Sequence, residues 1–110
     1  MARMFGYGRA SSDKQQITLL AQEEVCASYF KLKQIQEDDW EYAGWFPDAA
    51  ITSKIPLFER PMGVNIIGQI APGDTIVVSN FDRAFRSVID CHNCMMLCTE
   101  RKFFLVILDV

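Results

Sequence analysis

Four short apolar runs alternate with three helical segments along this chain of 110 residues. The apolar runs cover residues 4–8, 40–46, 75–79 and 103–108, and helical periodicity is found over residues 14–34, about 60–71 and 87–101. Strands that alternate with helices form mostly parallel sheets through right-handed crossovers. The sequence therefore predicts an α/β fold, a three-layer sandwich with a mostly parallel sheet of four to five strands.

Two of these elements carry more specific expectations. The first helix has apolar residues at three- and four-residue steps, which predict its sheet-facing side: Ile17, Leu20, Ala21, Val25, Tyr29 and Leu32. Ser12 or Asp13 is a candidate cap at its start. Residues 103–108 are apolar throughout, as is typical of a central parallel strand.

The composition limits the class of protein. Half of the residues are hydrophobic, enough for the core of one small domain, and no apolar run approaches the roughly 20 residues that span a bilayer. A net charge of −3 argues against a domain that holds nucleic acid by bulk electrostatics. No secretory signal is recognisable, and the four cysteines do not form a disulfide framework, so we expect a cytoplasmic protein.

Three of the cysteines, Cys91, Cys94 and Cys98, share one face of the third predicted helix with Val88 and Met95. Ligands on a single helix rarely surround zinc without a second segment, whereas cysteine packs readily as a small hydrophobe. We therefore interpret this cluster as core and predict no metal and no cofactor.

A candidate phosphate site lies where the first strand ends. Arg9 and Ser11 are two residues apart, so in an extended segment their side chains leave on the same face. Arginine binds phosphate oxygens in a forked geometry, and a serine hydroxyl is a potential nucleophile. Ligands of parallel α/β sheets bind beyond the carboxyl ends of the strands, which is where this pair is expected.

Further arginines are expected at the same edge of the sheet. Asp82, Arg83 and Arg86 follow the third strand, and Arg60 begins the second helix. If a helix starts near Arg83, Arg83 and Arg86 share one face of it, and Asp82 could cap that helix or hold a guanidinium. Several guanidinium groups around Ser11 would stabilise phosphoryl transfer without a metal.

Other phosphate and hydrolase chemistries fit poorly. The only histidine, His92, falls inside the third helix, so a Ser-His-Asp triad is improbable, and no P-loop motif is present. A receiver-like phosphoacceptor domain shares the fold class, but it would need clustered acidic residues at the strand ends, where this chain has arginines.

The combination of these motifs resembles the catalytic domain of the resolvase/invertase family of serine recombinases. The resemblance covers nearly the whole chain and rests on Tyr7-Gly8-Arg9-Ala10-Ser11-Ser12, on Glu59-Arg60-Pro61 and on the Asp-Arg-x-x-Arg signature of residues 82–86. It implies a resolvase-like fold, with Ser11 as nucleophile and with Arg9, Arg60, Asp82, Arg83 and Arg86 as further catalytic residues. It also implies supporting roles for Ser12, Gln15 and Asp48.

The resemblance implies site-specific DNA recombination. Ser11 would attack a DNA phosphodiester and form a 5′-phosphoserine intermediate, and strand exchange and religation would follow within a synaptic tetramer built from dimers. DNA is then the partner, bound through the full-length protein, and a bacterial, phage or mobile-element origin is expected. The alternative is a non-catalytic resolvase-like domain used for protein association or regulation.

The sequence departs from the family pattern at three places. The loop at residues 49–54 lacks the Ser-Gly pair that the family often has, and Phe85 stands where a small residue is common. Residues 1–110 also correspond to the catalytic domain only, so the dimerisation helix and DNA-binding domain are expected to be absent. We therefore expect the isolated domain to be inactive and to bind DNA poorly.

Overall fold

The computed structural model describes residues 2–12, 16–37 and 39–109, except for the side chains of Gln16 and Ile17. The order of elements is β1 (Ala2–Arg9), α1 (Gln16–Gln36), β2 (Trp40–Asp48), η2 (Leu57–Glu59), α2 (Pro61–Ile67), β3 (Thr75–Val78), α3 (Phe81–Ala84), α4 (Val88–Arg101) and β4 (Phe104–Ile107). Each predicted strand and helix is present, and the polar turn after β3 contains the additional short helix α3.

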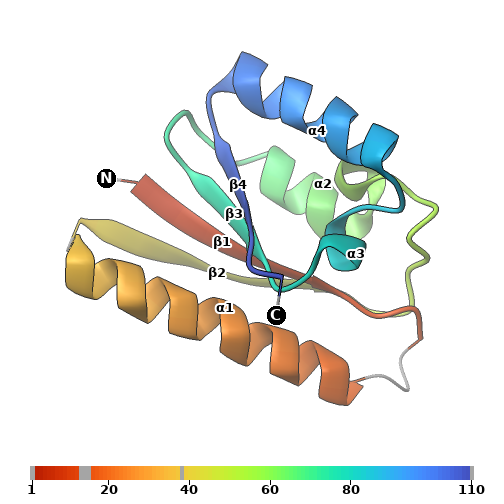
Figure 1. Ribbon diagram of the computed structural model, residues 1–110, viewed down its shortest axis with the longest axis horizontal. Coiled ribbons are helices and arrows are strands. Elements are labelled where there is room, and N and C mark those ends of the chain that lie inside the picture. Colours follow the sequence, from red (N-terminus) through yellow and green to blue (C-terminus); the bar gives the residue numbers. More distant parts are fainter. Residues whose placement is uncertain (1, 13–15, 38, 110) are drawn as a thin grey trace.

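The strands form one parallel sheet of four strands in the order β2-β1-β3-β4. Helix α1 covers one face of this sheet alone, and α2, α3 and α4 lie on the other (Figure 1). The predicted three-layer α/β sandwich is therefore confirmed. In the described part of the chain, no helix is long and apolar enough to cross a membrane.

Each face of the sheet has its own core. Phe5, Ile76 and Val78 pack with residues of α2 and α4, whereas Met4 and Val77 pack beneath α1. This alternation follows from the two-residue period of a strand, in which successive side chains point to opposite faces.

A bulge in β2 shifts this alternation by one residue. Met4 pairs with Tyr42 and Phe5 pairs with Gly44, so β2 has one extra residue at this point. Gly44 has a φ of +131°, a backbone conformation that residues with a side chain rarely adopt. Beyond the bulge, Trp45 packs in the same core as Tyr42, beneath α1.

The side of α1 that meets the sheet differs from the prediction. The buried residues are Leu19, Gln22 and Cys26, whereas Leu20 and Leu32 are 60% and 53% exposed. The apolar pattern gave this side only in part: Tyr29 packs against the core beneath α1 as predicted, but the pattern misses Gln22, a buried polar residue. Asp13 and the side chain of Ile17, both part of the predictions above, lie outside what is described.

The prediction of β4 as a central strand is wrong, since β4 is an edge strand. Its side chains nevertheless contribute to both cores, in which they are partly buried: Leu105 and Ile107 pack in one core and Val106 in the other. Phe104, the first residue of β4, is 60% exposed.

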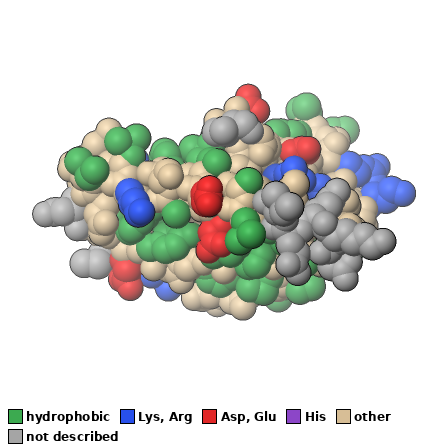
Figure 2. Space-filling view, turned by 90° about the horizontal axis from the view of Figure 1, so that it is seen from below, with side chains coloured by type: hydrophobic (Ala, Val, Ile, Leu, Met, Phe, Trp, Pro, Cys, Tyr) green, Lys and Arg blue, Asp and Glu red, His purple; other side chains and the backbone are tan. Residues whose placement is uncertain are grey.

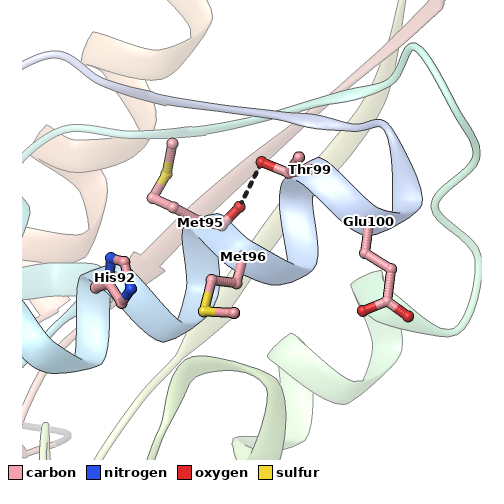
Figure 3. Close-up of a pocket in the computed structure, with 5 residues that line it drawn as sticks. All are labelled: His92, Met95, Met96, Thr99 and Glu100. Atoms are coloured by element: carbon pink, nitrogen blue, oxygen red, sulfur yellow. Dashed lines mark hydrogen bonds between the residues drawn. The ribbon is translucent and has the colours of Figure 1, made fainter.

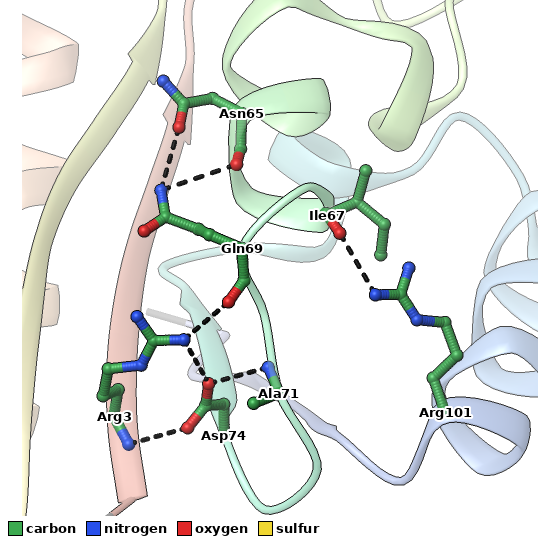
Figure 4. Close-up of polar contacts among 7 residues, drawn as sticks. All are labelled: Arg3, Asn65, Ile67, Gln69, Ala71, Asp74 and Arg101. Atoms are coloured by element: carbon green, nitrogen blue, oxygen red, sulfur yellow. Dashed lines mark hydrogen bonds and ion pairs between the residues drawn. The ribbon is translucent and has the colours of Figure 1, made fainter.

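The amino ends of the strands are joined by a polar network around Asp74 (Figure 4). Its carboxylate accepts hydrogen bonds from the backbone N–H and the guanidinium of Arg3, at 2.9 and 3.0 Å, and from the backbone N–H of Ala71. Arg3 also donates to the carbonyl of Gln69. This network fixes the turn before β3 to β1, at the end of the sheet opposite the candidate site.

Candidate active site

Arg9 is the last residue of β1 and is 7% exposed. Its guanidinium donates to the carbonyl of Ile51, at 2.9 Å, and to the carbonyl of Asp82, at 3.1 Å. The first of these residues lies in the loop after β2 and the second in α3. Arg9 therefore joins β1 to the two segments that flank it at the carboxyl edge of the sheet.

Arg60 is fully buried, with 0% exposure. Its guanidinium donates to three main-chain carbonyls, those of Ile55 at 2.7 Å, Arg83 at 2.7 Å and Ala84 at 3.0 Å. It also donates to the hydroxyl of Tyr7, at 3.2 Å. Arg60 is the residue before α2, so it ties the start of that helix to α3 and to the loop.

Tyr7 and Asp48 form the inner layer of this network. The Tyr7 hydroxyl donates to one carboxylate oxygen of Asp48, at 2.8 Å, and the other oxygen accepts from the backbone N–H of Met62 in the first turn of α2. Burial raises the pKa of Tyr7 well above its ordinary value and outweighs the opposite effect of Arg60. The phenol therefore stays neutral and links a cation to a carboxylate.

Arg83 completes a set of three interlocked arginines. Its guanidinium lies 3.4 Å from the carbonyl of Arg9, Arg9 donates to Asp82, and Arg60 donates to Arg83. Burial, and then the charges of Arg60 and Arg83, lower the pKa of Arg9. Lys and Arg side chains also gather towards the right-hand end of Figure 2, the end at which β1 and β2 finish in Figure 1.

Two guanidinium nitrogens of this set have unused donors. The Nε atoms of Arg9 and Arg83 are buried and have no hydrogen-bond partner among the residues that are described. The Arg83 Nε lies 3.9 Å from the carboxylate of Asp82, too far for a hydrogen bond. A buried donor without a partner costs free energy, so both positions favour an added acceptor.

Ser11 and Ser12 follow Arg9 after one intervening residue, Ala10. Ser11 is exposed and Ser12 is half-buried, in a bend beyond the end of β1. Gln15, the third residue expected here, lies outside the described residues. An exposed hydroxyl two residues after a buried guanidinium fits the arrangement expected of a nucleophile beside its phosphate ligands.

Gln22 of α1 belongs to the site, although no motif or periodicity indicates it. Its side-chain oxygen accepts from the Arg9 backbone N–H and its side-chain nitrogen donates to the Arg9 carbonyl, both at 3.1 Å. Gln22 is 4% exposed. Gly8 permits this contact, since a Cβ there would lie 2.9 Å from the Gln22 oxygen and 2.4 Å from the ring of Trp45.

Arg86 does not join the other three arginines. The helix α3 ends at Ala84, and Phe85 is extended, with φ −129° and ψ 150°, so Arg83 and Arg86 do not share a helical face as predicted. Phe85 itself is buried in the core against Phe81. Asp82 does not cap the helix as suggested: Asn80 is at the N-cap and the Asp82 side chain is 74% exposed.

The cysteines of α4 lie apart from this site. Cys94 and Cys98 are buried in the core and Cys91 packs against it, which confirms the prediction of core packing. Val88 and Met95 do not share that face, since they are 78% and 44% exposed. Within the described residues, no group of three or more His, Cys, Asp or Glu side chains could hold a metal ion.

His92 also lies away from the arginines, on the outer side of α4. It lines a shallow hollow of about 440 Å³ with four other residues of that helix, Met95, Met96, Thr99 and Glu100 (Figure 3). A single helix provides all of these side chains, and none belongs to the candidate site.

The comparisons with known proteins agree with this arrangement. A family model, Resolvase, N terminal domain, matches residues 4–110. The crystal structure of the N-terminal catalytic domain of TP901-1 integrase has the same fold, with a TM-score of 0.68 and 23% identity over 96% of this chain and 76% of that chain. No curated protein matches the sequence.

The family model covers the strand that ends at Arg9, the loop, and the Asp-Arg-x-x-Arg segment after β3. These are the segments that the structure brings together at the carboxyl edge of the sheet. The chain therefore belongs to the resolvase N-terminal domain family of serine recombinases.

Proposed function

We propose that this chain is the catalytic domain of a site-specific DNA recombinase in which Ser11 is the nucleophile. The single observation that carries the proposal is the interlocked set of Arg9, Arg60 and Arg83 at the end of β1, with the exposed residue Ser11 two positions after Arg9. Membership of the resolvase family supports the same reaction.

In the proposed reaction the Ser11 oxygen attacks a DNA phosphorus atom. The bond from phosphorus to the 3′ oxygen breaks, the 3′ oxygen takes a proton, and a 5′-phosphoserine remains. After strand exchange, the 3′ hydroxyl of another strand attacks the phosphoserine and releases Ser11. Each step exchanges one phosphoester for another, so the bond energy is retained and no ATP is needed.

The arginines are proposed to stabilise the charge that develops on the phosphate oxygens. Arg83 suits this role because its side chain is 24% exposed, whereas the buried Nε atoms of Arg9 and Arg83 can meet a phosphate only after the surrounding segments move. Arg86 is exposed and can approach DNA from outside the cluster. Asp82 is proposed to orient Arg83 or to take part in proton transfer, with Ser12, Gln15 and Asp48 in supporting roles.

Arg60 is proposed to have a different role from Arg9 and Arg83. Four of its five N–H groups donate within the protein and its side chain is fully buried, so a direct phosphate contact requires that the segments around it move. We propose that it first positions the main chain around Arg83. Assembly of DNA-bound dimers into a synaptic tetramer, in the cytoplasm of a bacterial host, is part of the same proposal, and the 110 residues alone are proposed to be inactive.

The test is covalent trapping by the full-length protein. The protein is incubated with a library of random duplex DNA and quenched with detergent, and DNA that remains attached to protein is recovered and sequenced. We expect an adduct at Ser11 by mass spectrometry that is lost in Ser11→Ala and retained in Ser12→Ala. An unchanged yield of adduct in Ser11→Ala, or no adduct in the wild type, would refute the proposed function and favour a non-catalytic role.

A further inference from the structure

We infer that Lys54, from the loop after β2, and Arg86, from the segment before α4, together bind one backbone phosphate of DNA. Neither the family model nor the motifs of the sequence assign a function to Lys54. The inference deepens the proposed function, on which it rests, by naming a second phosphate-binding position beside the interlocked arginines.

The two cations line the same surface depression, which has a volume of about 200 Å³. Ser87 and Asn93 provide polar groups to its wall. Lys54 and Arg86 are 32 positions apart in the sequence and both are exposed, so only the fold brings them together. A depression of this size and polarity fits a phosphate group.

The charges in the depression favour an anion. In the described part of the chain, neither Lys54 nor Arg86 forms an ion pair, since the two pairs found there are Arg3–Asp74 and Arg83–Asp82. Two cations that line one depression without forming an ion pair repel each other, and an anion between them reduces that repulsion.

Asp90 is the one carboxylate in the depression, and it is already engaged at the start of α4. Its carboxylate accepts from the backbone N–H of Arg86, at 3.2 Å, and its own backbone N–H donates to the hydroxyl of Ser87, also at 3.2 Å. This reciprocal capping holds Asp90 to the main chain rather than to either cationic side chain. The two cations and this carboxylate leave a net positive charge.

DNA phosphate is the ligand that the surroundings favour. The depression lies on the segment that follows Arg83, and Lys54 belongs to the same loop as Ile51 and Ile55, whose carbonyls hold Arg9 and Arg60. Arginine binds phosphate through two nitrogens, and lysine adds a point charge.

The test measures the salt dependence with which the full-length protein binds a labelled 20-base-pair duplex of random sequence. The slope of log Kd against log salt concentration reports the number of phosphates neutralised, with about one unit lost for each phosphate contact removed. The variants are Lys54→Gln, Arg86→Gln and the double variant, with Lys31→Gln on the exposed side of α1 as the charge-matched control. Lys54→Arg keeps the charge.

We expect each single variant to lower the slope, the double variant to lower it by about one unit in total, and Lys54→Arg to preserve it. A slope for Lys54→Gln equal to that of Lys31→Gln would overturn the inference, as would additive losses of about two units or a wild type without salt-dependent binding. The covalent-trapping assay with Ser11→Ala distinguishes this inference from the proposed function. If the adduct depends on Ser11 but Lys54→Gln does not change the salt slope, the proposed function stands and the phosphate site at Lys54 is refuted.

Discussion

Arg60 offers a quantitative test of the interlocked arginines. Replacement by alanine removes a fully buried guanidinium and the four hydrogen bonds that it donates, and it leaves the carbonyls of Ile55, Arg83 and Ala84 without a partner. Each buried carbonyl that loses its donor costs about 1–3 kcal/mol, and water entering the space recovers part of that. We expect Arg60→Ala to lower the free energy of unfolding by about 3–5 kcal/mol.

This loss is large for a domain of this size, whose total stability is typically about 5–15 kcal/mol. It corresponds to a fall in Tm of roughly 15–25 °C. Arg60→Lys retains the charge but not the fork of donors, and we expect it to cost about 2 kcal/mol.

The measurement is urea denaturation followed by circular dichroism and tryptophan fluorescence. Arg86→Ala is the matched control, because it removes the same side chain from an exposed position, and its expected effect is within about 0.5 kcal/mol. If Arg60→Ala costs less than about 1 kcal/mol with an unchanged m-value, or if the two variants are equally destabilised, the structural role assigned to Arg60 is wrong.

Three further variants test the surroundings of the site. Gln22→Leu removes both hydrogen bonds between this side chain and the Arg9 main chain. We expect it to lower the free energy of unfolding by about 1–3 kcal/mol and to slow adduct formation at Ser11. Gly8→Ala places a methyl group against Trp45 and Gln22, and we expect a similar loss by urea denaturation. Burial raises the pKa of Cys26 from 9.0 to about 12. The free energy of unfolding should therefore fall as the pH rises from 9 towards 12, by up to about 1.4 kcal/mol per pH unit. We expect Cys26→Ala to make the urea midpoint less dependent on pH in this range, and an unchanged dependence would contradict the prediction.

The sequence was sufficient for the architecture because strands and helices differ in period. It was insufficient for two placements that depend on tertiary packing. The residues of β4 are as apolar as those of a central strand, although β4 lies at the edge, because its side chains pack in the cores on both faces of this sheet. The buried face of α1 is centred on Gln22, a polar residue that any hydrophobic pattern excludes.

In the candidate site, too, some residues could be placed from the sequence and others could not. Arg9, Ser11 and Arg83 could be placed at one edge from their positions after strands. Gln22 could not, because it acts on the main chain of a residue 13 positions away. The separation of Arg86 from Arg83 also depends on packing, since the burial of Phe85 draws the chain out of helical conformation between them.

The hydrogen bonds of Arg9 and Arg60 have a consequence for variation in this protein. Apart from the Tyr7 hydroxyl, every acceptor that these two guanidinium groups use is a main-chain carbonyl. A carbonyl is present whatever the side chain, so the loop at residues 49–56 can, apart from Lys54, diverge in sequence while it keeps its path. An insertion or deletion there moves the acceptors themselves, so we expect homologues to tolerate substitutions in this loop more readily than changes in its length.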